Sequence, residues 1–284
     1  KADDALAEIE RLKKELSESK SEAEQLRLTK AYNKETDALS ATDWFQKGYN
    51  AGINEEYDKA ISFYLRCIEL DPTAAAYYNL GIAYKGQGNL TKAIQLYEKA
   101  IELKPDYAAA CYNLGVAYGM QGNTAKAISF YLRCIELDPD YPDAYYNLGN
   151  AYRKQGNYIK AIELYKKAIE LDPDDAKAYV NLGLAYYNQG NYIKAIELYE
   201  KAIELKPDYA KAYYNMGIAY ADQGNTAKEI ESYKKAIELD PDDAMAYNNL
   251  GLAYYDQGNT AKAIELYEKA IELNPYYAKA YVNL

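Results

Sequence analysis

Histidine is absent from this chain of 284 residues, and cysteine occurs only three times. Histidine is the commonest general base and metal ligand, so its absence argues against catalysis and against a metal site. Three cysteines in so long a chain do not make a disulfide framework. The sequence also contains no glycine-rich phosphate loop and no cluster of metal-ligating residues. We therefore expect no enzyme activity, no cofactor and no metal.

Long apolar runs and an excess of positive charge are missing as well. No run of about 18 apolar residues could form a transmembrane helix, and no signal peptide is visible. The 33 lysines and arginines against 43 aspartates and glutamates give a net charge of −10, which argues against nucleic acid or membrane insertion. Because the chain begins at Lys1 and not at Met, its location stays open. The cytoplasm is slightly favoured over the cell surface or exterior, where the glycosylation sequon at Asn89 would matter.

The sequence does contain a repeat, seen clearly in residues 142–175 (PDAYYNLGNAYRKQGNYIKAIELYKKAIELDPDD). Variants of this stretch fill the chain from Ala41 to the C-terminus. Self-similarity at a period near 34 indicates a stack of small units and not one globular core. The frame sets the repeats at 41–73, 74–107, 108–141, 142–175, 176–209, 210–243 and 244–277, followed by a partial helix at 278–284.

Two sets of apolar residues within each repeat recur at helical spacing. In repeat 142–175 a break at Gly156-Asn157 separates them, since glycine suits the left-handed end of one helix and asparagine the start of the next. Pro173 cannot continue the second helix. The first set is Tyr145, Leu148, Gly149 and Tyr152, and the second is Ala161, Tyr165, Ala168, Ile169 and Leu171. The spacing predicts a helix, a tight turn and a second antiparallel helix.

This pattern resembles the tetratricopeptide repeat family, whose repeats carry an aromatic residue, Leu-Gly, Tyr, Ala, an aromatic residue, Ala and Pro. In repeat 142–175 these are Tyr145, Leu148-Gly149, Tyr152, Ala161, Tyr165, Ala168 and Pro173, and the resemblance covers residues 41–284. It implies an all-α fold, a right-handed α-solenoid superhelix of helix-turn-helix repeats, with an extra N-terminal helix in this chain. It also implies a concave surface that binds proteins or peptides.

Residues 1–39 differ from the repeats and contain neither glycine nor proline. Their heptad-like seam consists of Ala5, Ile9, Leu12, Leu16, Ser19, Ala23 and Leu26. It predicts a charged helix that forms a coiled coil, docks on a repeat, or stays solvated as a frayed tail. The sequence from Ser40 to Asp43 resembles a capping box, so a new helix is expected to begin there.

The candidate binding face lies on the first helix of each repeat. Its fifth, ninth, twelfth and thirteenth residues share a stripe separate from the core stripe, and this stripe is rich in tyrosine and aliphatic residues. The resemblance places it on the concave surface, unless packing between helices hides most of it. The candidate partner-binding residues are Tyr78, Ile82, Tyr112, Val116, Tyr146, Asn147, Asn150, Arg153, Lys154, Lys177, Asn181, Leu184, Tyr187, Lys211, Tyr214 and Asn215.

One asparagine per repeat, at the sixth position, belongs to this set. In some members of the family such a series holds an extended peptide backbone; alternatively each asparagine bonds to its own neighbouring repeat. Basic residues gather near Asn150, whereas Asp222 and Asp256 lie further along the chain. Because the fifth position is never lysine and the sixth never arginine, the full carboxylate clamp of chaperone-binding members is not expected. A basic spot that accepts an acidic side chain remains an alternative.

Substitutions of two kinds fall at core positions. Glu229 stands where the other six repeats have alanine, which indicates either local loosening of repeat 210–243 or a functional acid. The three cysteines, Cys67, Cys111 and Cys134, also occupy core positions and are expected to be buried and reduced.

The sequence thus predicts a scaffold that binds a peptide or helix of another protein in a concave groove. The alternative is a self-assembling structural protein that forms head-to-tail oligomers or filaments through its repeat ends and N-terminal helix, so that the partner is another copy of itself.

Overall fold

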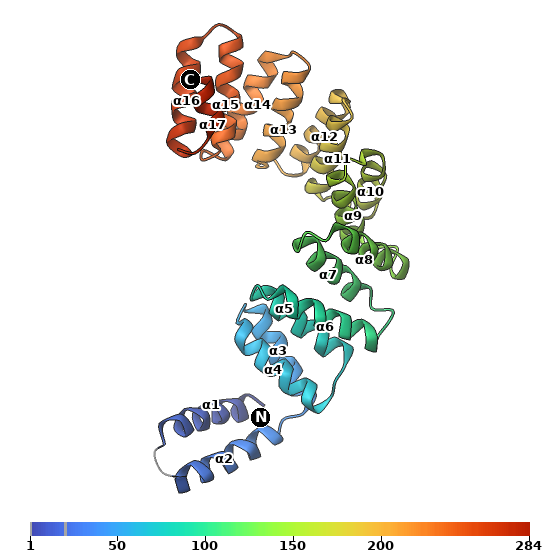
Figure 1. Ribbon diagram of the computed structural model, residues 1–284, viewed down its shortest axis with the longest axis vertical. Helices are drawn as coiled ribbons and strands as arrows, with labels where there is room; N and C mark the ends of the chain where they lie inside the picture. Colours follow the sequence, from blue (N-terminus) through green and yellow to red (C-terminus); the bar gives the residue numbers. More distant parts are fainter. Residues whose placement is uncertain (1, 20–21) are drawn as a thin grey trace. The chain divides into compact units, whose positions relative to one another are not determined.

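The computed structural model describes residues 2–19 and 22–284, and in these residues α-helices are joined by short turns without any strand (Figure 1). By packing, the chain divides into two units, unit 1 (Lys1–Leu137) and unit 2 (Asp138–Leu284).

Unit 1 consists of a helical hairpin and three helix pairs. The hairpin is α1 (Ala2–Glu18) and α2 (Glu22–Asp37). The pairs are α3 (Ala41–Ile53) with α4 (Tyr57–Leu70), α5 (Ala74–Gly86) with α6 (Leu90–Leu103), and α7 (Ala108–Met120) with α8 (Thr124–Leu137). Each pair packs internally, α4 packs on α5, and α6 packs on α7.

Unit 2 repeats the same arrangement. Its pairs are α9 (Pro142–Lys154) with α10 (Tyr158–Leu171), α11 (Ala176–Asn188) with α12 (Tyr192–Leu205), α13 (Ala210–Asp222) with α14 (Thr226–Leu239), and α15 (Ala244–Asp256) with α16 (Thr260–Leu273). The short helix α17 (Ala278–Asn283) packs on α16. The predicted all-α solenoid of helix-turn-helix repeats is confirmed.

The turn inside each pair has the geometry that the sequence predicts. Gly156 lies at φ +76°, a left-handed conformation that side chains disfavour. The Asn157 side chain then accepts a hydrogen bond from the backbone N–H of Lys160 at 3.2 Å and caps the second helix. In repeat 41–73 the equivalent residue is Glu55, which adopts φ 59° without the freedom of glycine.

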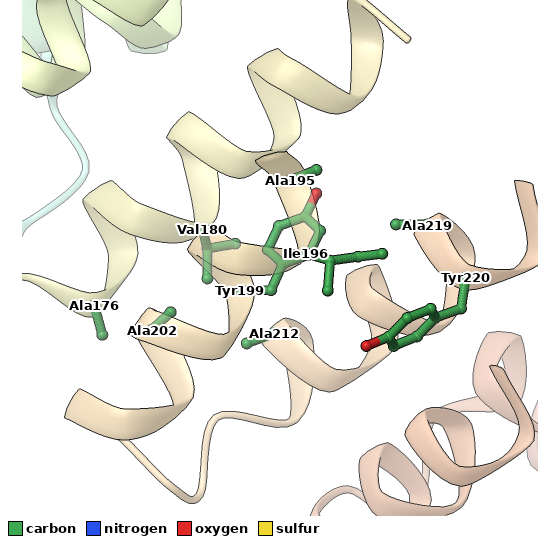
Figure 2. Packing of buried hydrophobic residues seen from close by; sticks show 9 residues of the cluster. All are labelled: Ala176, Val180, Ala195, Ile196, Tyr199, Ala202, Ala212, Ala219 and Tyr220. Carbon is green, nitrogen blue, oxygen red and sulfur yellow. The ribbon is translucent and has the colours of Figure 1, made fainter. Parts of the chain in front are cut away.

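The core of every repeat is built on one close contact between its two helices. A Cβ added to Gly149 of α9 would lie 2.8 Å from the ring of Tyr165 in α10, and Tyr165 itself is fully buried. The same contact recurs in the other repeats described, as between Gly183 and Tyr199. Around Tyr199, side chains from α11, α12 and α13 meet in one buried cluster (Figure 2). Stacking of neighbouring helix pairs therefore buries apolar side chains that a single pair would leave exposed to water.

The N-terminal segment forms two helices, where the sequence predicted one. Helix α1 ends in a serine-rich stretch, and Ser17 Oγ donates to the Lys14 carbonyl at 2.7 Å. Serine side chains compete in this way for backbone hydrogen bonds and weaken a continuous helix. The predicted seam consequently does not extend into α2: Leu26 is 59% exposed, whereas Leu28 is buried. The seam position Ala23 has a side chain outside the described part of the chain.

The hairpin packs on the first repeat of unit 1. Ile9 of α1 shares a buried cluster with Trp44 and Cys67, and Arg66 forms an ion pair with Asp37 at 3.1 Å. At the junction the expected capping box is present, because Ser40 and Asp43 bond reciprocally at the start of α3.

The glycine contact can be tested within a single helix, α3. A Cβ on Gly48 would lie 2.7 Å from the Tyr64 ring, whereas a Cβ on Gly52 would have no neighbour within 4 Å. We expect Gly48→Ala to lower the free energy of unfolding by about 1–3 kcal/mol through overpacking. Gly52→Ala should raise it by up to about 1 kcal/mol, because alanine favours the helix. Urea unfolding of both variants measures this; equal effects would contradict the packing described.

Candidate partner-binding face

The fifth-position tyrosines of the candidate face are half-buried and pack against the buried tyrosines of the core. The ring centroids of Tyr146 and Tyr165 are 6.0 Å apart, and those of Tyr214 and Tyr233 are 5.9 Å apart. The ninth-position side chains Ile82, Val116, Asn150 and Leu184 are likewise half-buried. Packing therefore covers part of this face and leaves the rest accessible.

The asparagine series connects neighbouring repeats. Asn181 Nδ2 donates to the hydroxyl of Tyr146, in the preceding repeat, at 2.6 Å. The same bond joins Asn113 to Tyr78 at 2.9 Å and Asn249 to Tyr214 at 3.2 Å. Of the two interpretations of the series, bonding to the neighbouring repeat is therefore the one seen in these pairs.

Asn215 lacks this bond. The residue at the tyrosine position of the preceding repeat is Val180, which is 1% exposed and has no hydroxyl to accept a hydrogen bond. Asn215 is only 8% exposed, and its Nδ2 has no hydrogen-bond partner within the described residues. A buried donor without an acceptor costs free energy, so this position departs from the pattern of its neighbours.

A cavity of about 540 Å³ lies beside Asn215. It brings together three of the candidate residues, Lys211, Tyr214 and Asn215. Its lining is completed by Ala210 and by four residues at and after the end of α14, Asp240, Asp242, Asp243 and Met245. The predicted stripe does not include the aspartates, although the Asp-Pro-Asp-Asp sequence before the next repeat is a visible signal of local charge.

The predicted basic cluster is only partly a surface feature. Lys154, Lys177 and Lys211 are exposed, but Arg153 is half-buried and its Nε is buried without a hydrogen-bond partner among the described residues. The Tyr165 hydroxyl donates to Asn150 Oδ1 at 2.8 Å. Burial raises the pKa of Tyr165 to about 12, although the nearby guanidinium of Arg153 counteracts part of this effect.

Acidic groups occupy the face further along unit 2. Tyr187, a candidate residue, donates its hydroxyl proton to Asp222. Glu229 is 8% exposed, and its pKa is raised to about 7 by burial first and then by the charges of Asp256 and Asp222. The sequence showed all three carboxylates but not that the charges of Asp256 and Asp222 act on the pKa of Glu229.

Cys67, Cys111 and Cys134 are buried thiols, as predicted. Within the described residues no group of His, Cys, Asp or Glu could hold a metal ion. None of the described helices is long and apolar enough to cross a membrane.

Family models match most of the repeat region. One, described as "Tetratricopeptide repeat", matches residues 38–106, 73–140 and 174–242. Two others of the same description match residues 214–278 and 130–163, and one described as "TPR repeat" matches residues 149–190.

Among curated proteins, the chain is similar to the mitochondrial import receptor subunit TOM70 of Saccharomyces cerevisiae. The two are 38% identical over 78 residues, which is 28% of this chain. The match spans 12% of the length of that protein.

Solved structures extend the similarity. MamA is 34% identical with a TM-score of 0.54, covering 58% of this chain and 97% of MamA. YrrB, described as a TPR protein with an unusual peptide-binding site, is 26% identical with a TM-score of 0.54, covering 66% of this chain and 96% of YrrB. A repeat protein from Cytophaga hutchinsonii is 23% identical with a TM-score of 0.67 over 84% of this chain and 99% of that one, and shows the fold alone.

The asparagine bonds yield a matched stability test. Asn181→Ala removes the hydrogen bond that Asn181 donates to the Tyr146 hydroxyl. Asn215→Ala instead removes an amide donor that has no partner within the described residues. Both create the same loss of volume at the same repeat position. We expect Asn181→Ala to lower the free energy of unfolding by about 1–2 kcal/mol more than Asn215→Ala. Thermal and urea unfolding give the comparison, and equal losses would show that the bond adds no stability.

The Glu229 carboxyl predicts a pH dependence of stability. Below its ordinary pKa of 4.5, the carboxyl is protonated in both the folded and the unfolded chain and carries no charge penalty. Between 4.5 and about 7 the unfolded chain releases the proton while the folded chain keeps it, so stability falls as pH rises. Relative to Glu229→Gln, the wild type should lose about 2–3 kcal/mol over this range. A difference between the two proteins that stays constant with pH would contradict this.

Proposed function

The chain belongs to the tetratricopeptide repeat family, and from this premise we propose that it is a protein-interaction scaffold. It holds a peptide or helix of another protein along the face formed by the first helices of its repeats. The acidic net charge of −10 favours a protein partner over nucleic acid. The description of YrrB as a peptide-binding member of the family supports the same role.

One observation carries the proposal, the unpaired amide of Asn215 beside the cavity of about 540 Å³. An extended peptide carries backbone carbonyls that accept hydrogen bonds, and the buried Asn215 Nδ2 lacks an acceptor within the described residues. A carbonyl of the bound peptide therefore supplies the group that Val180 cannot supply.

The other walls of the cavity suit the same occupant. Tyr214 and Met245 provide apolar contact area, and the ring of Tyr214 is stiff and loses little conformational entropy on binding. Lys211 and the aspartates at 240, 242 and 243 provide charges of both signs for the side chains of the peptide. Because the cavity lining combines apolar area with charges of both signs, it distinguishes peptides by their side chains.

Selection from a displayed library of unstructured random peptides tests the proposal. Selected peptides should bind the wild-type protein and should lose affinity by about tenfold or more in Asn215→Ala, which removes the amide donor. The Lys201→Ala variant is the control, because Lys201 is exposed on α12 and forms an ion pair with the neighbouring Glu204 at 2.8 Å. Failure to select any peptide, or equal affinity for the wild type and Asn215→Ala, would overturn the proposal.

Self-assembly is the competing candidate. Tyr281, Val282 and Leu284 in and after α17 are 53%, 84% and 51% exposed, and contiguous exposed apolar residues mark interaction surfaces. Light scattering on the same samples separates the two functions. A molecular mass that rises with protein concentration, together with no peptide binding, would favour assembly. A constant molecular mass together with peptide binding would favour the scaffold.

A further inference from the structure

A second cavity lies in unit 1, where the N-terminal hairpin packs on the first repeat. Its volume is about 330 Å³, within the range of small-molecule sites. Helices α1 and α2 contribute part of its lining, and α3 and α4 contribute the rest. None of the candidate residues of the partner-binding face lines it, so this cavity is separate from the peptide site proposed above.

Trp44 gives the cavity a hydrogen-bond donor that lacks an acceptor. Its side chain lines the cavity and is only 3% exposed, and its indole Nε1 is buried with no hydrogen-bond partner within the described residues. An indole N–H can only donate, and a buried polar group without a partner costs free energy. A ligand that carries an acceptor to Trp44 removes that cost.

The charged residues of the lining are mostly cations. Lys13, Lys59 and Arg66 line the cavity, against the single carboxylate of Glu10. This surplus of positive charge favours an acceptor that is itself negatively charged, because such hydrogen bonds are the stronger ones.

Two of the three cations already have acidic partners outside the lining. Arg66 pairs with Asp37 at 3.1 Å, and Lys59 pairs with Glu56 at 3.1 Å. None of the ion pairs among the residues that the structure describes includes Lys13. Lys13 is therefore the cation that can meet a negative charge in the cavity without giving up a partner.

Apolar side chains from both sides of the junction also line the cavity. They are Leu6 and Ile9 of α1 and Phe63 of α4, and all three belong to the hydrophobic cluster that contains Trp44. The rings of Phe63 and Trp44 lie with their centroids 5.7 Å apart. An apolar group placed against these side chains leaves water, which is favourable.

We propose that this cavity binds a small organic carboxylate with an apolar body. The carboxylate accepts a hydrogen bond from Trp44 Nε1 and pairs with Lys13. The apolar body lies against Leu6, Ile9 and Phe63. Because Lys13 belongs to α1 and Trp44 to α3, the bound acid also holds the hairpin on the first repeat.

A carboxylate fits this lining better than a phosphate or a neutral group. One cation without an ion pair and one N–H without an acceptor match a single negative charge. A phosphate monoester carries about −1.5 to −2 charges and needs more donors. A neutral amide of the same shape satisfies Trp44 but leaves Lys13 without a counter-charge.

The single tryptophan of the chain allows a direct test. The indole N–H of Trp44 gives one signal in a nuclear magnetic resonance spectrum of the full chain, and 3-phenylpropanoate should move this signal to saturation. The neutral 3-phenylpropanamide and the short acid acetate should each bind at least about tenfold more weakly, since one lacks the charge and the other the apolar body. An indole signal that does not respond to 3-phenylpropanoate, or equal affinity for the acid and its amide, would overturn the proposal.

Two neighbouring lysines of α1 supply a matched pair of variants. Lys13 and Lys14 are both exposed, but only Lys13 lines the cavity. Lys13→Met keeps the length of the side chain and should weaken the binding of 3-phenylpropanoate by about tenfold, whereas Lys14→Met should leave it unchanged. Equal affinities of the two variants contradict the role of Lys13.

The donor itself is tested by Trp44→Phe, which keeps an aromatic ring and removes the indole N–H. Isothermal titration calorimetry should show weaker binding of 3-phenylpropanoate than in the wild type, and unchanged binding excludes the hydrogen bond. Because Lys13 is exposed, the lysine variants decide the question even where Trp44→Phe fails to fold.

The same chemical group also occurs at the end of a peptide that finishes in phenylalanine. Nα-acetyl-glycyl-phenylalanine carries this carboxylate and ring together with a stretch of backbone. It should bind more weakly than 3-phenylpropanoate, because a cavity of about 330 Å³ offers its added backbone little room. Tighter binding of this peptide would reject a free acid as the ligand.

Discussion

The contact between a glycine on the first helix and a tyrosine ring on the second is the constraint on which each repeat depends. The ring can lie close to the helix backbone only because glycine has no side chain, as at Gly149 and Tyr165. This brings the two helices close and fixes which side of the first helix is covered. The neighbouring stripe, with Tyr146 and Tyr214, is only half covered by this packing and remains partly accessible to other molecules.

Most polar groups on that stripe already serve the stack. The side-chain amide of Asn181 donates a hydrogen bond to the Tyr146 hydroxyl, and the side-chain oxygen of Asn150 accepts one from the Tyr165 hydroxyl. The first bond links neighbouring repeats and the second links the two helices of one repeat, so these groups have little left to offer a ligand. The repeats therefore differ in side-chain chemistry where one repeat departs from the others. These places are the pair Val180 and Asn215, and Glu229. A repeat protein can acquire specificity in this way without altering its architecture.

Periodicity and local chemistry were enough to predict the helix pairs, the left-handed turn at Gly156, the cap at Ser40 and the burial of Cys111. They did not predict the contacts that depend on how one repeat packs against the next. The partner of Asn181 lies 35 residues earlier in the chain, and no spacing rule within a repeat points to it. The predicted heptad seam was also wrong in α2. The break between α1 and α2 rotates the later side chains about the helix axis and leaves Leu26 exposed.

The missing bond between Val180 and Asn215 has a mechanical consequence. Neighbouring first helices in unit 2 are tied together by an asparagine–tyrosine link, as at Tyr214 and Asn249, but the joint between α11 and α13 lacks one. Local opening at this joint therefore breaks one hydrogen bond fewer than at a joint that has the link. A guest that accepts a hydrogen bond from Asn215 replaces the absent link and makes opening at this joint costlier.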